Sequence, residues 1–125
     1  MKIVIVSAQG MRNGLVHGPD DPFDPERELM RPSTVLALKR DAIREAVARF
    51  RTANPRVFGS VLHGTDHENS DLDLLVDALP GATLLDLGGL QEELTSLLGI
   101  HVDLLTPGDL PEKIRSDVLA QARPV

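Results

Sequence analysis

The sequence predicts a small α/β (α+β) domain, in which helices pack on a mixed β-sheet. Two segments, one following Ser33 and one ending at Gly99, carry apolar residues at the three-to-four-residue spacing of helices. Three short apolar segments, residues 56–60, 71–76 and 100–105, are typical of strands. A length of 125 residues suits one hydrophobic core. The expected order of elements is therefore α-β-β-α-β-α.

The first 30 residues differ from the rest. Lys2 to Val6 predicts a short edge strand, and the Gly- and Pro-rich stretch after it predicts a loop. No GxGxxG pattern follows the strand, which argues against a dinucleotide-binding turn. We therefore interpret residues 1–30 as an N-terminal extension and residues 31–125 as the domain.

Within that domain, Ser33 or Thr34 is expected to cap the first helix, which Asn54-Pro55 ends. One face of this helix carries Leu36, Ile43, Val47 and Phe50. The second helix has a leucine face and stops at Gly99, a typical C-terminal residue. A last helix is expected over residues 111–120, and a polar loop over residues 65–69.

The composition and net charge exclude or disfavour several classes of function. The chain has no Cys, which excludes disulfides, thiolate metal sites and cysteine nucleophiles and suits a reducing compartment. A net charge of −6 disfavours general binding to nucleic acid. No window approaches the roughly 20 apolar residues of a membrane helix, and Met1 to Val6 is too short for a signal-peptide core. We expect a soluble, cytoplasmic domain.

The residues that carry chemistry lie around the second strand. Asp71 and Asp73 are two positions apart on a strand, so their side chains leave the same face, while Leu72 and Leu74 point into the core. Adjacent carboxylates repel, and a divalent cation removes this penalty. Asp103 lies in a third strand with the same Asp-Leu-Leu pattern and joins this face if the two strands pair.

A glycine turn precedes these acids. Gly59 allows close approach of the backbone to a phosphate, and Ser60 offers a hydroxyl and an N–H. Acids for a metal beside a turn for phosphates predict phosphoryl-type transfer. Asp71 and Asp73 without this turn would equally suit a solvated strand face or a strand-start cap.

The combined pattern resembles the signature of the DNA polymerase β-like nucleotidyltransferase superfamily, and especially its minimal, MNT-type members. It comprises Gly59-Ser60, Gly64 and the strand Ser70-Asp71-Leu72-Asp73-Leu74-Leu75-Val76, and the resemblance extends from about Ser33 to Val125. It implies Mg²⁺ as cofactor, in a two-metal site, and ATP as substrate. The implied catalytic and metal-binding residues are Asp71, Asp73 and Asp103, and the implied nucleotide-binding residues are Gly59, Ser60, His63, Gly64 and Ser70.

MNT-type proteins are paired with HEPN RNases in toxin–antitoxin modules. The resemblance therefore implies an antitoxin that forms a hetero-oligomer with a HEPN toxin and transfers AMP to a toxin hydroxyl, expected to be a tyrosine. About 20 residues follow Asp103, too few for a separate acceptor-holding domain. The family often has Arg where this chain has His63, so a fixed positive charge on the phosphates is missing.

Three alternatives remain open: a non-catalytic antitoxin that acts by binding, which His63 favours; a small-molecule nucleotidyltransferase of the aminoglycoside-modifying kind; and a structural partner subunit. Several polar residues have plainer interpretations. His101 shares a face with Asp103, and we expect an ordinary, partly buried histidine there. Asp66, Glu68 and Asn69 are expected to form a solvated loop, and Arg44, Arg49 and Arg51 a solvated helix face.

Overall fold

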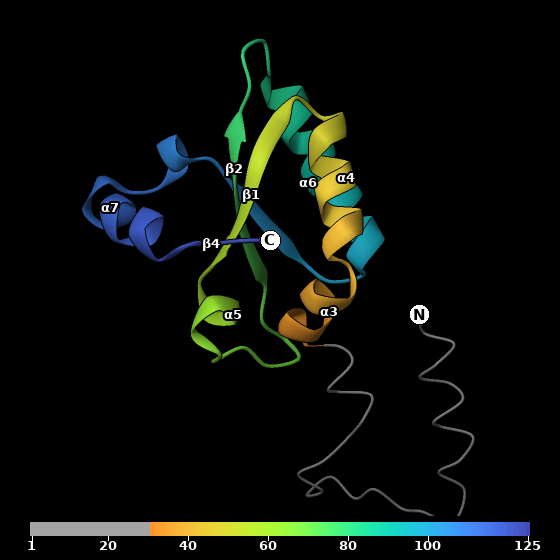
Figure 1. Cartoon of the computed structure of the whole chain (residues 1–125), viewed down its shortest axis with the longest axis vertical. Helices are drawn as coiled ribbons and strands as arrows, with labels where there is room; N and C mark the ends of the chain where they lie inside the picture. The colour runs from red at the N-terminus through yellow and green to blue at the C-terminus, as the bar shows by residue number, and fades with distance from the viewer. Residues whose placement is uncertain (1–30) are drawn as a thin grey trace, which may run out of the picture.

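The computed structural model describes residues 31–125, so the strand and loop predicted for residues 1–30 lie outside the described residues. Figure 1 shows the arrangement of the elements. In chain order they are α3 (Pro32–Leu38), α4 (Arg40–Arg49), β1 (Thr52–Phe58), α5 (Ser60–His63), β2 (Leu72–Ala78), α6 (Leu84–Leu98), β3 (Val102–Leu105), the 3-10 helix η1 (Pro107–Asp109), α7 (Glu112–Gln121) and β4 (Arg123–Pro124).

The strands form one mixed sheet in the order β3-β2-β1-β4. β1 runs antiparallel to both β2 and β4, whereas β2 and β3 are parallel. Helices α4 and α6 lie side by side on one face of the sheet, and α7 lies on the opposite side (Figure 1). The predicted α/β class with a mixed sheet is confirmed.

The hydrophobic core fills the space between the sheet and the α4–α6 layer. Leu72, Leu74 and Val76 alternate along β2 and are fully buried against this layer. Full burial of such a side chain contributes about 2 kcal/mol. The helices contribute Ile43, Val47, Leu90 and Leu94. Because alternate residues of a strand face opposite ways, the odd-numbered residues of β2 are left for the other face.

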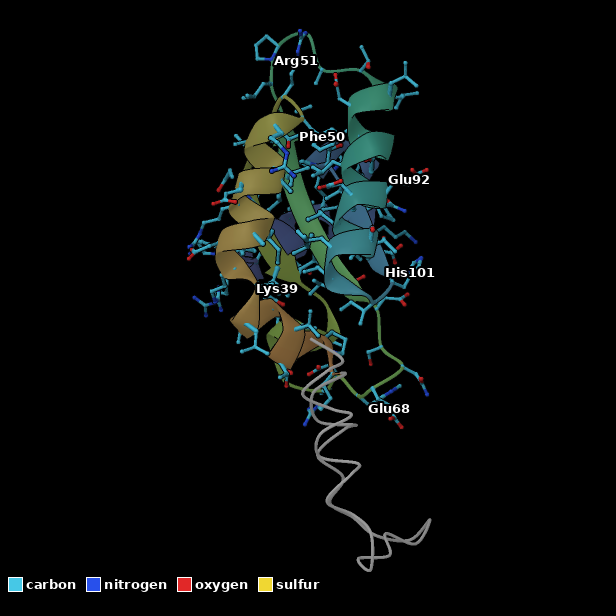
Figure 2. The ribbon with its side chains drawn as sticks, turned by 90° about the vertical axis from the view of Figure 1, so that its right-hand side faces the viewer. Lys39, Phe50, Arg51, Glu68, Glu92 and His101 are labelled. Atoms are coloured by element: carbon cyan, nitrogen blue, oxygen red, sulfur yellow. The ribbon has the colours of Figure 1, made fainter. Side chains whose placement is uncertain are left out.

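The predicted first helix is two helices. Lys39 leaves the helical conformation, with φ −120° and ψ 21°, and separates α3 from α4 (Figure 2). Helix α4 then ends at Arg49, and the ring of the next residue, Phe50, lies between α4 and α6. Gly89 of α6 permits this contact, because a Cβ at Gly89 would lie 3.0 Å from the Phe50 ring.

Asn54-Pro55 does not end the helix, as the sequence suggested. It lies inside β1, where the pairing with β2 is irregular between Ala53 and Arg56. A bulge tolerates proline, which has no N–H to donate to the sheet, and Asn54 adopts a left-handed φ of 57° there. The short β4 and η1 were not predicted. By contrast, Gly99 ends α6 with a left-handed φ of 70°, as expected.

Helix α7 has no buried residue. Its anchor is Arg115, which donates hydrogen bonds to the carbonyl oxygens of Pro107 (2.9 Å) and Leu110 (2.8 Å). At the end of β4, Val125 is buried in the core and its carbonyl oxygen accepts two hydrogen bonds from Arg44. Within residues 31–125, none of the helices has the length and apolar character needed to cross a membrane.

Candidate active site

The parallel pairing of β2 and β3 brings the three predicted aspartates together. Asp73 pairs with Asp103 in the register of these strands, and Leu72 N donates to the carbonyl oxygen of His101 at 3.0 Å. Leu72 occupies the core face, so Asp71 and Asp73 take the opposite face, as alternation along a strand requires. The sheet thus presents a cluster of carboxylates on the face away from α4 and α6.

One ligand atom each from Asp71, His101 and Asp103 lies within 4.8 Å of the others. His101 Nδ1 is 3.1 Å from Asp71 Oδ1, and the His101 side chain is 59% exposed. The expectation of a partly buried His101 was therefore wrong. Because β3 is an edge strand and His101 is the residue that precedes it, its side chain can remain in solvent beside the acids.

Asp73 has the most perturbed environment of this cluster. Desolvation by partial burial, followed by repulsion from Asp103 and Asp71, raises the pKa of Asp73 from 3.8 to about 6. A hydrogen bond with Asp103 adds to this rise in pKa, whereas His101 lowers it. The Asp73 carboxyl is therefore harder to ionise in the folded chain than in water, first because it is partly buried and then because other carboxylates are near. A divalent cation fits such a donor set, because carboxylate oxygens and an imidazole nitrogen are common metal ligands.

The glycine turn lies directly against Asp73. Phe58 pairs with Asp73 across β1 and β2, so Gly59 follows at the same level of the sheet. Gly59 has a φ of 76° and a ψ of −148°, and a Cβ at this position would overlap the Asp73 carboxylate. Both the backbone conformation and the space therefore require glycine here. The predicted phosphate turn and the predicted metal ligands thus form one site.

The other predicted nucleotide-binding residues lie in α5 and in the loop that follows it. His63 is exposed at the end of α5, and Gly64 follows with a left-handed φ of 71°. Ser60 contributes its carbonyl oxygen, which accepts from Thr65 N at 3.0 Å. The Ser70 hydroxyl accepts from His67 N at 2.9 Å and so helps to shape the loop of residues 65–70 before Asp71.

Sequence reasoning missed the role of Asp66, whose side chain is fully buried rather than solvated. Ser33 N donates to Asp66 Oδ2 at 2.9 Å. Arg31 Nη2 donates to the Asp66 carbonyl oxygen at 2.9 Å and lies 3.6 Å from Oδ1. Asp66 thereby caps α3, whose own N-cap residue makes no side-chain capping bond. The prediction that Ser33 or Thr34 caps the first helix was wrong, because Arg31 is the N-cap residue and both Ser33 and Thr34 lie inside α3.

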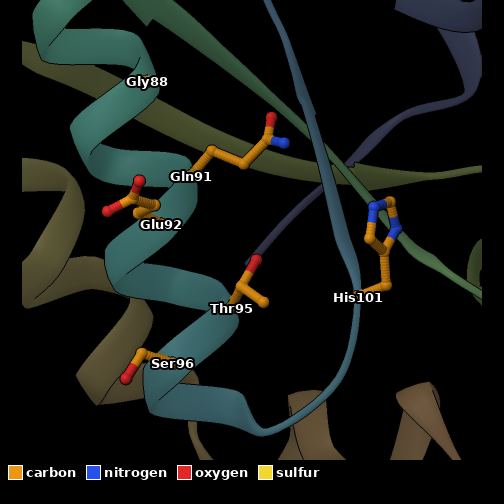
Figure 3. Close-up of a pocket in the computed structure, with 6 residues that line it drawn as sticks. All are labelled: Gly88, Gln91, Glu92, Thr95, Ser96 and His101. Atoms are coloured by element: carbon orange, nitrogen blue, oxygen red, sulfur yellow. The ribbon is translucent and has the colours of Figure 1, made fainter.

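An open groove runs along α6 beside the edge strand β3. It is lined by Gly88, Gln91, Glu92, Thr95, Ser96 and His101 (Figure 3). Gln91 Oε1 accepts from Leu104 N at 3.3 Å and so covers one outward-facing backbone group of the edge strand. The groove adjoins the acidic cluster through His101.

A small mixed sheet with carboxylates on its parallel strand pair, next to a Gly-Ser turn, defines a nucleotidyltransferase. Comparison with known proteins agrees: residues 40–125 match the nucleotidyltransferase domain family, and the chain belongs to this family of enzymes. It is 36% identical to the protein adenylyltransferase MntA of Thermococcus cleftensis over 88 residues, which cover 70% of this chain and 86% of that protein.

Two solved structures share the fold. One, described as a minimal nucleotidyltransferase, is 41% identical with a TM-score of 0.68, and the match covers 74% of this chain and 95% of that chain. The other is a crystal structure of a toxin–antitoxin with AMP-PNP, 27% identical with a TM-score of 0.51, covering 74% and 70% of the two chains.

Proposed function

We propose that this nucleotidyltransferase is a protein adenylyltransferase and an antitoxin. It would transfer AMP from ATP to a hydroxyl, expected to be a tyrosine, of a partner HEPN RNase with which it forms a hetero-oligomer. The observation that carries the proposal is the convergence of Asp71, Asp73 and Asp103 beside the Gly59-Ser60 turn. The similarity to a protein named protein adenylyltransferase and to a toxin–antitoxin bound to AMP-PNP supports the choice of nucleotide and partner.

The proposed roles follow from position. Asp71, Asp73 and Asp103 would hold Mg²⁺, in a two-metal site, and Asp103 would also take the proton of the acceptor hydroxyl. When bound, Mg²⁺ supplies positive charge that neutralises the phosphates in the transition state. Gly59 and Ser60 would contact the triphosphate through their backbone, next to the carboxylates that hold the cation.

His63, Gly64 and Ser70 would complete the nucleotide site. His63 is exposed and carries charge only when it is protonated, so it would support the phosphates less than a permanently charged arginine. Positioning by the Gly59-Ser60 turn and by the loop of residues 65–70 then matters more for the reaction rate. ATP binding weaker than that of a chain with arginine at this position is the expected consequence.

We also propose that residues 31–125 form the catalytic unit and that residues 1–30 are an extension. The contacts of Arg31 and Ser33 with Asp66 support this boundary, because they tie the start of α3 to the loop that precedes Asp71. Residues from Arg31 onwards therefore contribute to the shape of the site.

The test is to incubate the partner RNase with ATP, Mg²⁺ and a substoichiometric amount of this protein. Intact-mass analysis of the RNase should show the addition of AMP, and peptide mapping should place it on a tyrosine. RNase activity should remain low after this protein has been stripped away. The Asp71→Asn/Asp73→Asn double variant, checked for folding by circular dichroism, should give neither result.

A different outcome would identify a passive antitoxin. In that case both proteins would silence the RNase equally, only while bound, in equimolar amount and without any change in mass. AMP added by the wild type to a residue other than tyrosine would leave the activity in place and correct only the acceptor.

A further inference from the structure

His101 stands at the rim of the acidic cluster and was not among the predicted metal ligands. The backbone fixes its place, because its carbonyl oxygen accepts from Leu72 N at 3.0 Å. Its ring reaches Asp71, with Nδ1 3.1 Å from Oδ1, while most of the side chain is in solvent. Position 101 is also two residues from Asp103, so both side chains leave the same face of the sheet.

The spacing of the candidate ligand atoms is close to the spacing of ligands around a bound ion. The ligand atoms of Asp71, His101 and Asp103 lie within 4.8 Å of one another. Two ligands of one ion with bonds of about 2.1 Å lie about 3.0–3.4 Å apart when they are adjacent and at most about 4.2 Å apart when they are opposite. The 3.1 Å between His101 Nδ1 and Asp71 Oδ1 already matches adjacent ligands. The exposed side chains of Asp71 and His101 can close the remaining gap to Asp103 by torsional changes.

The chemical type of the ligand atoms affects the choice of cation more than their number does. Mg²⁺ prefers oxygen ligands, whereas an imidazole nitrogen suits transition metals and raises their affinity relative to that of Mg²⁺. A site with Asp71, Asp103 and His101 is therefore a mixed oxygen–nitrogen site. Carboxylate oxygens alone would select only weakly among hard cations.

We propose that His101 is a nitrogen ligand of the divalent cation held by Asp71 and Asp103, and that it makes this site prefer Mn²⁺ to Mg²⁺. The inference rests on the proposed function insofar as a divalent cation must bind there. It assigns to His101 a role in metal selection that the three aspartates do not provide. Mg²⁺ remains able to bind through the oxygens.

The decisive measurement is pulsed electron paramagnetic resonance of Mn²⁺ bound to the full chain without nucleotide. Electron spin-echo modulation should reveal a directly coordinated nitrogen in the wild type and in His17→Ala, which removes an imidazole elsewhere in the chain. The signal should be absent in His101→Ala and in His101→Gln. Because the His101 side chain is mostly exposed, both variants should fold normally.

Calorimetry then measures selectivity. Loss of even an outer-shell partner of a metal ligand typically weakens metal binding by about 10–100-fold. His101→Ala should therefore weaken Mn²⁺ by at least about tenfold, since it removes the ligand itself, and Mg²⁺ by less than about threefold. His101→Gln should behave in the same way, because it restores an oxygen and not a nitrogen.

The outcomes separate this inference from the proposed function. Wild-type protein that binds Mn²⁺ without nitrogen coupling, or His101 variants with an unchanged Mn²⁺-to-Mg²⁺ affinity ratio, would overturn the inference. His101 would then act only as an ion-pair partner of Asp71, and AMP transfer would remain as proposed. Wild-type protein that binds no divalent cation, with or without ATP, would overturn both.

Discussion

Two regions of the molecule remove an aspartate from solvent, with opposite results. In the loop of residues 65–70, the Asp66 carboxylate is completely buried and is met by protein donors, the N–H of Ser33 and the guanidinium of Arg31. On the strand pair β2–β3, Asp73 is only partly buried, and its nearest charged neighbours include Asp103 and Asp71. In the first region an arginine and a backbone N–H face the carboxylate, whereas in the second the neighbouring carboxylates outweigh the single nearby histidine.

The two carboxylates differ in their neighbours, and the proposed function assigns a structural role to Asp66 and a metal-binding role to Asp73. Asp66 accepts a hydrogen bond from a backbone N–H in the first turn of α3, which has no partner inside the helix. Asp73 is desolvated and lies near two other carboxylates, and its raised pKa means that its ionised form costs stability in the folded protein. A bound cation would offset that cost. If burial were the only criterion, Asp66 would be the better candidate for a ligand-binding carboxylate. When the neighbouring charges are considered, Asp73 is the better candidate.

The largest expected effect comes from Gly59→Ala, which tests whether the strand-pair region needs its tight turn. The new Cβ would overlap the Asp73 carboxylate, and the φ of 76° would be strained. We expect AMP transfer to fall by at least about 100-fold and the free energy of unfolding to fall by about 2–3 kcal/mol. Transfer assays and urea unfolding measure the two effects.

Gly99→Ala is the matched control. Gly99 has a similar φ of 70°, but a Cβ there would meet nothing within 4 Å. Only the backbone strain should remain, at about 1 kcal/mol, and transfer should not change. Equal losses of activity in the two variants would mean that contact with Asp73 is not what makes Gly59 necessary.

The acidic site on β2 and β3 could be predicted from the sequence because it depends on the spacing of residues within single short strands. Asp71 and Asp73 are related by the two-residue period of a strand, and Asp103 repeats the pattern in another short strand. Only the pairing had to be assumed, and the parallel register with Asp73 opposite Asp103 supports that assumption. His101 was identified on the correct face, but its exposure depends on β3 being an edge strand.

The loop region could not be predicted, because its partners are distant in the sequence. Ser33 and Asp66 are 33 residues apart, and a loop rich in polar residues looks solvated when it is considered alone. The break at Lys39 and the inclusion of Pro55 in β1 were missed for a related reason. Packing and sheet pairing overrode local preferences at both positions.

Asp66→Ala should have the second largest effect. It removes the acceptor of the Ser33 N–H and the partner of the Arg31 guanidinium, and it leaves a buried cavity. We expect a loss of about 2–3 kcal/mol in the free energy of unfolding, measured by urea denaturation. Asp66→Asn keeps an oxygen acceptor for the Ser33 N–H and should lose less.

Asp117→Ala, at an exposed position of α7, provides the comparison and should change stability by less than about 0.5 kcal/mol. If Asp66→Ala were as harmless as this control, the bonds to α3 would contribute little. The proposed distinction between the two aspartates would then fail on the structural side.

The smallest expected effect has the opposite sign and concerns Asp73→Asn without metal. The folded protein raises the pKa of Asp73 to about 6 from an ordinary value of 3.8, so ionised Asp73 is less favourable in the folded state than in the unfolded state. Well below about pH 4 the group is protonated in both states and costs nothing. As the pH rises from about 4 to about 6, the folded protein loses stability relative to a neutral asparagine variant, and above about pH 6 the loss is nearly complete.

Asp73→Asn should therefore be more stable than the wild type at about pH 8 in EDTA, by about 1–2 kcal/mol after allowance for solvent screening. This advantage should shrink as the pH falls from about 6 to about 4 and approach zero only below about pH 3. Saturating Mg²⁺ should reverse the order, because a cation that binds only the folded wild type stabilises it. Thermal unfolding at both pH values, with and without Mg²⁺, measures all of these differences.

A variant that is less stable than the wild type in EDTA at alkaline pH would show that the charge of Asp73 is compensated within the protein. Asp73 would then be a structural acid of the same kind as Asp66.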